Sequence, residues 1–161
     1  MLHVRNAGVR LLTSVPLTLA LALTLLAGYT LSPAAPEANA ALISARKADD
    51  ATDWARTRKG SPYVWGADGP RRFDCSGLTR WAYKKVGRLL PHSSAAQVGF
   101  TKRIQKEDRR RGDLMFFYSR SGVYHVAIYA GQGYMWDAPR PGERVQRIKP
   151  WTSRVFYGRV K

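Results

Sequence analysis

The residue with the clearest chemical potential in this 161-residue sequence is Cys75, the only cysteine in the chain. It stands in the segment 73–78, with the sequence FDCSGL, where a turn is predicted to run into a helix. A lone thiol has no partner for a disulfide within the chain, and the free amides and dipole of a helix start stabilise its thiolate. The position therefore predicts a nucleophile, whereas a buried, unreactive cysteine is the alternative when Cys75 is judged alone.

A cysteine nucleophile needs a base, and the sequence contains only three histidines, His3, His92 and His125. His3 belongs to an N-terminal segment that export would remove. His92 precedes a short predicted helix, where capping or simple exposure is a sufficient explanation. His125 stands within a predicted strand, 123–129, and the small side chain of Ala127 leaves space beside it on the same face. We therefore predict that His125 is the base.

A third group is needed to hold the imidazole ring and fix its tautomer, and Asp137 is the candidate. If residues 131–133 form a three-residue loop between two antiparallel strands, Asp137 lies on the face of His125, one diagonal step away. A two-residue turn without a bulge would place Asp137 on the opposite face. The loop thus decides whether Asp137 can complete a triad.

Together these residues predict the chemistry of a cysteine hydrolase. The thiolate of Cys75 attacks a carbonyl carbon, His125 protonates the leaving amine, and water then hydrolyses the acyl-enzyme. The Cys75 amide and the Tyr63 hydroxyl are candidate donors to the oxyanion, and each donor of this type contributes about 3 kcal/mol.

The hydrophobic pattern predicts an α+β fold, because helices come first along the chain and antiparallel strands follow. Helices are expected at 43–58, from 75 or 76 to about 86, and at 93–97. Strands are expected at 114–118, 123–129, 134–137, 143–148 and 155–160. In this arrangement N-terminal helices pack on a C-terminal antiparallel sheet, with the nucleophile at a helix N-terminus.

The first 40 residues have the order of a secretory signal peptide: basic residues, an apolar stretch over 11–31, and small residues up to Ala40. Cleavage is expected after Ala40, which would leave 41–161 as a single secreted domain. The alternative is an uncleaved membrane anchor, since the apolar stretch is long enough to cross a bilayer. Pro16 interrupts that stretch, so no stable membrane anchor is expected.

The formal net charge of +16 favours an anionic partner. Export argues against nucleic acid, and the common nucleic-acid-binding motifs are absent from the sequence. The phosphate and carboxylate polymers of a bacterial cell wall are the simplest target, and a charge that only maintains solubility is the alternative. No metal or other cofactor is expected, because one cysteine and two histidines after export offer too few soft ligands.

Several motifs in order resemble the NlpC-type cell-wall cysteine peptidases. The residues that carry the resemblance lie in five segments: YVWG at 63–66, FDCSGL at 73–78, LPHSSAAQ at 90–97, GDL at 112–114 and HVAIY at 125–129. The resemblance runs from residue 48 to residue 160. It implies a papain-like α+β fold and cleavage of peptidoglycan stem peptides, typically between D-γ-glutamate and a diamino acid.

By motif position, the resemblance implies that Cys75 is the nucleophile, His125 the base, and Tyr63 the tyrosine beside the oxyanion. Four further positions are implied to bind substrate: Asp74, Ser76, Trp65 and Ser94. The chain departs from the family where Asp137 stands in place of a common histidine, His92 in place of a frequent arginine, and Ala67 in place of a frequent glycine.

The expected protein is therefore a secreted, wall-associated and monomeric peptidoglycan endopeptidase that uses Cys75, His125 and Asp137. An N-acetylmuramoyl-L-alanine amidase, which shares this chemistry, is one alternative. A non-catalytic cationic module that binds the wall is the other.

Overall fold

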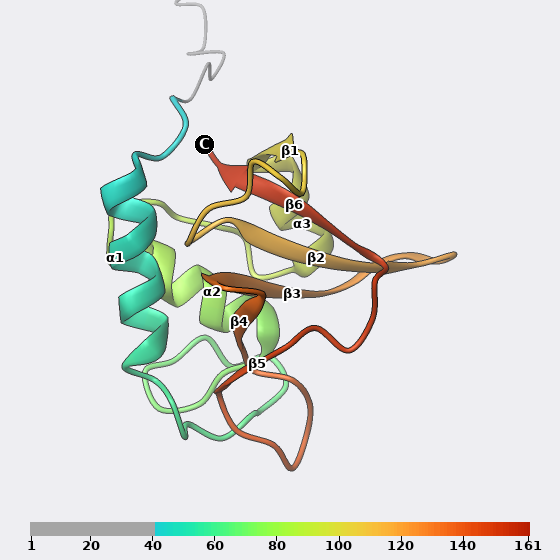
Figure 1. Cartoon of the computed structure of the whole chain (residues 1–161). Coiled ribbons are helices and arrows are strands. Elements are labelled where there is room, and N and C mark those ends of the chain that lie inside the picture. The colour runs from blue at the N-terminus through green and yellow to red at the C-terminus, as the bar shows by residue number, and fades with distance from the viewer. Residues whose placement is uncertain (1–40) are drawn as a thin grey trace, which may run out of the picture. The chain divides into compact units, whose positions relative to one another are not determined.

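The computed structural model describes residues 41–161, and the predicted signal peptide with its cleavage site lies outside that range. The described part contains three helices and six strands (Figure 1). The helices are α1 (Ala45–Arg56), α2 (Cys75–Lys84) and α3 (Ser94–Gly99). The strands are β1 (Thr101–Ile104), β2 (Leu114–Ser119), β3 (Gly122–Gly131), β4 (Tyr134–Asp137), β5 (Gln146–Ile148) and β6 (Val155–Val160).

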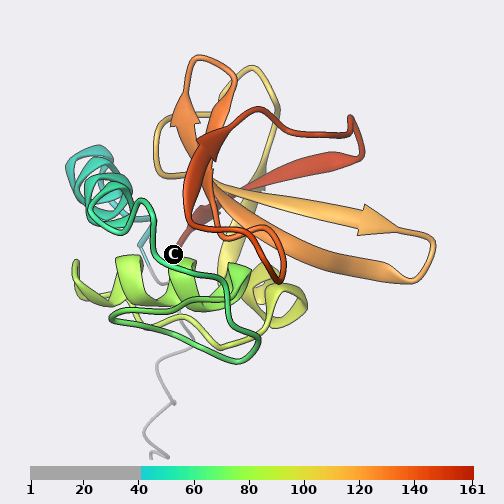
Figure 2. The ribbon, with the colours of Figure 1, turned by 90° about the horizontal axis from the view of Figure 1, so that it is seen from below.

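The six strands form one antiparallel sheet in the order β1-β6-β2-β3-β4-β5. The hairpin of β2 and β3 occupies the centre, and α2 and α3 lie side by side along one face of the sheet (Figure 2). The prediction of an α+β fold with helices before an antiparallel sheet is confirmed. Among residues 41–161, no helix is long and apolar enough to span a membrane.

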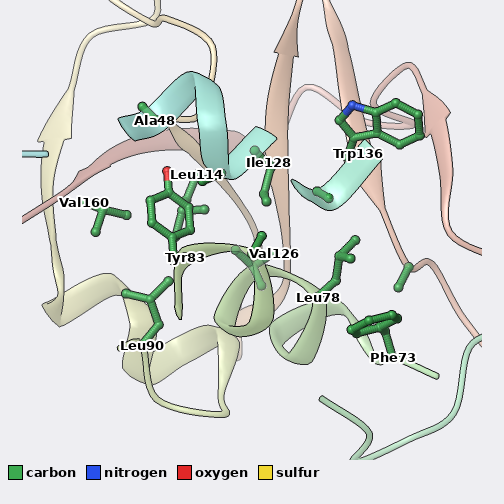
Figure 3. Packing of buried hydrophobic residues seen from close by; sticks show 14 of the residues in the cluster. Ala48, Phe73, Leu78, Tyr83, Leu90, Leu114, Val126, Ile128, Trp136 and Val160 are labelled. Atoms are coloured by element: carbon green, nitrogen blue, oxygen red, sulfur yellow. The ribbon is translucent and has the colours of Figure 1, made fainter. Parts of the chain in front are cut away.

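The main core lies between the helices and the sheet (Figure 3). Leu78 and Tyr83 of α2 are fully buried and lie beside Val126 and Ile128, which alternate along β3 and face the helices. Along α1 the buried positions are small, Ala48, Ala51, Thr52 and Ala55, so this helix approaches its neighbours closely. The apolar stripe of α2 therefore sets where its first residue, Cys75, lies relative to β3.

The other face of the central strands is buried as well. A second cluster there consists of Met115, Phe117, Ala127, Tyr129, Met135 and Tyr157. Burial of both faces explains why β2 and β3 contain continuous apolar runs instead of a simple alternation. The strand that carries His125 is thus held by packing on each side.

The predicted helices and most predicted strands are confirmed within a few residues. The strand expected at 143–148 is shorter, because only Gln146–Ile148 pairs with β4. Strand β1 was not predicted: its segment is basic and its pairing partner, β6, lies far along the chain. A four-residue edge strand with two exposed cations has little hydrophobic pattern to reveal it.

The start of α2 is packed tightly against the preceding loop at Gly77. A β-carbon on Gly77 would lie 2.1 Å from the carbonyl oxygen of Ala67, which is a backbone atom that cannot swing away. The same loop carbonyl accepts a hydrogen bond from the amide of Asp74 at 2.8 Å. Gly77 therefore allows the loop and the helix start to pack in contact.

We predict that Gly77→Ala destabilises the domain by about 2–3 kcal/mol, because the added methyl group forces the loop away from the helix. Urea denaturation measures the change. Gly99→Ala is the matched control, since nothing lies within 4 Å of a β-carbon built there. The control should stay within about 0.5 kcal/mol of the unmodified protein. Equal stability of the two variants would show that the close contact carries no energetic cost.

Candidate active site

His125 and Asp137 form a buried hydrogen-bonded pair. Nε2 of His125 lies 2.7 Å from Oδ1 of Asp137, and the two residues are 6 % and 0 % exposed. Because Nε2 is engaged by the carboxylate, Nδ1 is the ring nitrogen left for another partner. The pair has the geometry of an imidazole whose orientation and tautomer are set by an acid.

The turn between β3 and β4 places Asp137 on the face of His125, although not by the expected loop. The structure has a two-residue turn of Gln132 and Gly133, with Gly131 paired to Tyr134, so the predicted three-residue loop is wrong. A shift in register between Tyr129 and Gly131 inserts one extra residue and restores the same parity. Gln132 has a φ of 55° and Gly133 a φ of 78°, as a tight hairpin turn of this kind requires.

The surroundings of His125 favour its protonated form. Burial by itself lowers the pKa of His125, but hydrogen-bonding and charge interactions with Asp137 and Cys75 outweigh it and raise the pKa to about 10. Burial also raises the pKa of Asp137, and its interaction with His125 opposes that effect. Asp137 and Cys75 therefore together favour the imidazolium form of His125.

Cys75 is the first residue of α2, and Asp74 is the N-cap of that helix. Oδ1 of Asp74 accepts hydrogen bonds from the Gly77 amide at 2.6 Å and from the Ser76 hydroxyl at 3.0 Å. Its Oδ2 accepts a hydrogen bond from the Gly66 amide at 2.9 Å. One carboxylate therefore joins the helix start to the loop before it, and Cys75 sits at the positive end of the helix dipole.

Tyr63 lies near these groups. Burial raises the pKa of its phenol, and the charges of Cys75, Asp74 and Asp137 raise it further. A tyrosine with a raised pKa stays protonated and so remains a hydrogen-bond donor.

A cavity of about 240 Å³ opens beside Cys75. The predicted substrate-binding residues Asp74, Ser76, Trp65 and Ser94 all line it, with Gly66, His92, Ser93 and Tyr124. Trp65 is 84 % exposed, so most of its indole is available to a ligand. The four residues that the resemblance implied as substrate-binding therefore lie at one cavity with Cys75, whereas Tyr63 is not among the residues that line it.

Two residues of the cavity were missed as site residues. His92 was explained by capping or exposure, but its Nε2 lies 2.9 Å and 3.0 Å from the two oxygens of Asp74, next to the nucleophile. Tyr124 directly precedes His125 and is half exposed. Position within the LPHSSAAQ motif was the available signal for His92, whereas nothing in the sequence alone distinguished Tyr124 from a surface strand residue.

The short helix α3 is attached to α2 through a buried glutamine. Gln97 is fully buried, and its side-chain amide donates hydrogen bonds to the carbonyl oxygens of Ser76 at 3.0 Å and Pro91 at 2.9 Å. Its Oε1 accepts a hydrogen bond from the Thr79 hydroxyl at 2.8 Å. Gln97 therefore positions the segment with His92 and Ser94 at the cavity.

The arrangement can support nucleophilic attack on a carbonyl carbon. The parts are a thiol at a helix N-terminus, an imidazole whose pKa that thiol raises, a carboxylate hydrogen-bonded to the imidazole, and a tyrosine whose pKa the thiol also raises. Such a set can hold a thiolate and imidazolium and return the proton to a leaving amine. Among residues 41–161, no group of three or more His, Cys, Asp or Glu side chains is placed to hold a metal ion.

Residues 60–160 match the model of the NlpC/P60 family. The chain belongs to this family. A probable endopeptidase of Corynebacterium glutamicum is 48 % identical over an alignment of 111 residues, and the match covers 63 % of this chain and 52 % of that protein. The bifunctional muramidase/DL-endopeptidase CwlT of Bacillus subtilis is 38 % identical over an alignment of 110 residues, and the match covers 64 % of this chain and 33 % of CwlT. The chain thus spans at most about half the length of these relatives.

Solved NlpC/P60 domains have the same fold. The domain of the peptidoglycan hydrolase SagA superposes with a TM-score of 0.65 at 33 % identity, over 74 % of this chain and all of that one. RipD of Mycobacterium tuberculosis, described as a non-catalytic NlpC/p60 protein adapted to peptidoglycan binding, has a TM-score of 0.60 at 29 % identity. Its match covers 71 % of this chain and 96 % of RipD. The predicted papain-like NlpC-type fold is confirmed, and the family contains both hydrolases and a binding protein.

The His125–Asp137 pair makes stability depend on pH. Because the pKa of His125 is 6.5 in the unfolded chain and about 10 in the folded one, its stabilising contribution is complete below pH 6.5 and is lost as pH rises towards 10. We predict that the free energy of unfolding falls more steeply over this range in the unmodified protein than in Asp137→Asn, whose amide holds an imidazolium poorly.

Urea denaturation at pH 6, 8 and 10 measures the two slopes. Asp50→Asn is the control, because Asp50 is an exposed carboxylate on α1, and this variant should follow the unmodified protein. Parallel curves for the unmodified protein and Asp137→Asn would show that the pair does not hold a charged imidazole.

Proposed function

We propose that this protein is a secreted cysteine endopeptidase that cleaves the stem peptides of peptidoglycan between D-γ-glutamate and a diamino acid. Cys75 is the nucleophile, His125 the general base and acid, and Asp137 the residue that orients His125. The observation that carries the proposal is the buried 2.7 Å pair of His125 and Asp137, together with a thiol at a helix start that also raises the pKa of His125.

Three further observations support a peptidoglycan substrate. The chain belongs to a family whose solved members include a peptidoglycan hydrolase. A relative at 38 % identity is named a DL-endopeptidase, which accords with a bond between a D-residue and a diamino acid of the L-series. The half-exposed Tyr124 and the exposed Trp65 leave the cavity open at its rim, as an attached polymer requires.

In the proposed reaction, the Cys75 thiolate attacks the γ-carbonyl carbon of D-glutamate while His125 is protonated. The Cys75 amide and the Tyr63 hydroxyl donate to the oxyanion. His125 then gives its proton to the departing amine of the diamino acid, which leaves an acyl-enzyme. Water, deprotonated by His125, releases the shortened stem peptide and regenerates the thiol.

We predict that Cys75→Ala lowers the rate of peptidoglycan digestion by about 10³-fold or more, because the nucleophile is lost. The measurement is mass spectrometry of purified peptidoglycan after digestion, with the appearance of new amino groups on the diamino acid as the expected product. A thermal unfolding midpoint equal to that of the unmodified protein is the control for folding. Digestion by the alanine variant at the normal rate would exclude the proposed nucleophile.

The same digest distinguishes the two alternatives. Free muramyl ends on the glycan would identify an N-acetylmuramoyl-L-alanine amidase. Binding to peptidoglycan without any new end would identify a non-catalytic module, for which RipD offers a precedent within the fold. The buried His125–Asp137 pair beside an accessible thiol favours catalysis over binding alone, since a binding module has no need of it.

The positive charge is proposed to hold the protein on the anionic polymers of the wall. Three of the basic pairs in the sequence are exposed in the structure: Arg71 and Arg72, Lys84 and Lys85, and Lys102 and Arg103. By contrast, the run at 109–111 is partly used within the protein, where Arg111 pairs with Asp53 at 2.7 Å and Arg110 binds the carbonyl of Ile43. The available charge is therefore distributed over several surfaces.

We predict that retention on intact cell walls falls about tenfold or more between 50 mM and 500 mM salt, because exposed charges are screened. Sedimentation of walls with bound protein measures it. Walls stripped of phosphate polymers are the control and should retain little protein at either salt concentration. Salt-independent retention would mean that the charge serves solubility alone.

A further inference from the structure

The connection from β5 to β6 crosses the sheet at the active site. In the strand order β1-β6-β2-β3-β4-β5, strand β5 is at one edge while β6 lies beyond β3 and β2. The chain between them must therefore pass β4, β3 and β2, and Figure 1 shows it running from β5 towards the hairpin end of β2 and β3 before turning back as β6. Trp151 stands in this connection.

Both ends of the connection are fixed by backbone pairing. Ile148 is paired with Met135 of β4, and Val155 is paired with Phe117 of β2. The carbonyl oxygen of Arg154 also accepts a hydrogen bond from the amide of Tyr118 at 3.3 Å. The path of the connection is therefore set by the sheet, and it brings Trp151 onto Phe117.

Trp151 and Phe117 form a stacked pair against the His125 ring. Their ring centroids are 4.3 Å apart with an interplanar angle of 13°. The His125 ring lies 5.1 Å from Trp151 at 63° and 5.3 Å from Phe117 at 72°. Phe117 is fully buried, whereas Trp151 is 51 % exposed, so removal of the indole would open the imidazole to water.

We propose that Trp151 is a positioning residue, which holds the imidazole of His125 at the angle where Nε2 meets Asp137 and Nδ1 meets Cys75. Asp137 restrains the ring at a single atom, and a ring held at one atom can still turn about that contact. The stacked pair of Phe117 and Trp151 restrains the ring plane. The inference rests on the Cys75–His125 pairing of the proposed function, but not on the identity of the substrate.

Loss of the indole should weaken the thiolate–imidazolium interaction. A ring that turns presents Nδ1 less well to Cys75, and water that enters beside it screens the attraction between the two charges. The titratable groups that act on His125 are Asp137 of β4 and Cys75 of α2. Tyr63 is in turn affected by the charges of Cys75, Asp74 and Asp137. A substitution at Trp151 removes none of these groups. A change in the reactivity of Cys75 would therefore report a change in the position of the imidazole and not a lost charge.

The test is the rate at which iodoacetamide alkylates Cys75 as a function of pH. Cys75 is the only cysteine in the chain, so mass spectrometry reports this thiol alone. At pH 5.5 only a thiolate stabilised by imidazolium reacts quickly, and Trp151→Ala should react about tenfold more slowly than the unmodified protein. At pH 10 thiols are largely ionised without assistance, and the two rates should agree within about twofold.

Three variants complete the experiment. Trp151→Phe retains a ring on Phe117 and should recover most of the rate at pH 5.5. Trp54→Ala is the matched control, because Trp54 is a 40 % exposed tryptophan on α1 that packs on Trp81. It should behave as the unmodified protein at both pH values. Trp151→Leu replaces the alanine variant if thermal unfolding shows that Trp151→Ala does not fold, and should also be slow only at pH 5.5.

Two results would overturn the inference. Alkylation of Trp151→Ala at the unmodified rate at pH 5.5, or acceleration by an equal factor at both pH values, would mean that the indole merely covers the site. If the unmodified protein itself reacted at pH 5.5 no faster than a simple thiol, the inference and the proposed Cys75–His125 pairing would fail together. The two failures are thus distinguished within one data set.

Discussion

The site depends on one buried charge and its partner. Asp137 is fully buried, and an isolated carboxylate in that position would be strongly destabilising. His125 supplies the compensating interaction at 2.7 Å. Removing either residue would leave the other buried without its partner. Two features of the domain keep the pair together. Packing on both sheet faces holds the strands in place, and the β3–β4 bulge keeps both side chains on one face.

The nucleophile is positioned by a different set of contacts. Asp74 ties the start of α2 to the preceding loop, and Gly77 lets the two pack without a side chain between them. Leu78 and Tyr83 then fix the helix on the sheet. Because these contacts do not involve His125, the thiol and the imidazole are each held independently, and their meeting follows from how the helix packs on the strands.

Much of the fold could be predicted because its elements carry strong local patterns. The apolar pattern along 123–129, the near-helical spacing of apolar residues along 43–58, and the glycines at the turns all have local physical causes. What could not be predicted involved partners far along the chain. Strand β1 exists because β6 pairs with it, and a bulge in place of a longer loop follows from how β3 and β4 align. His92 looked like a surface residue because its partner, Asp74, lies in another element.

The chemical inventory can be read without knowledge of the fold: a single thiol, very few imidazoles, a strong positive charge, and a series of motifs that resemble one family. Such properties depend only on residue types and short spacings. Tertiary structure alone decided that Asp137 is on the face of His125, that His92 lies at the cavity, and that the β5–β6 connection brings Trp151 onto the imidazole. The reason is that packing and strand order set these contacts, and neither is a local property of the chain.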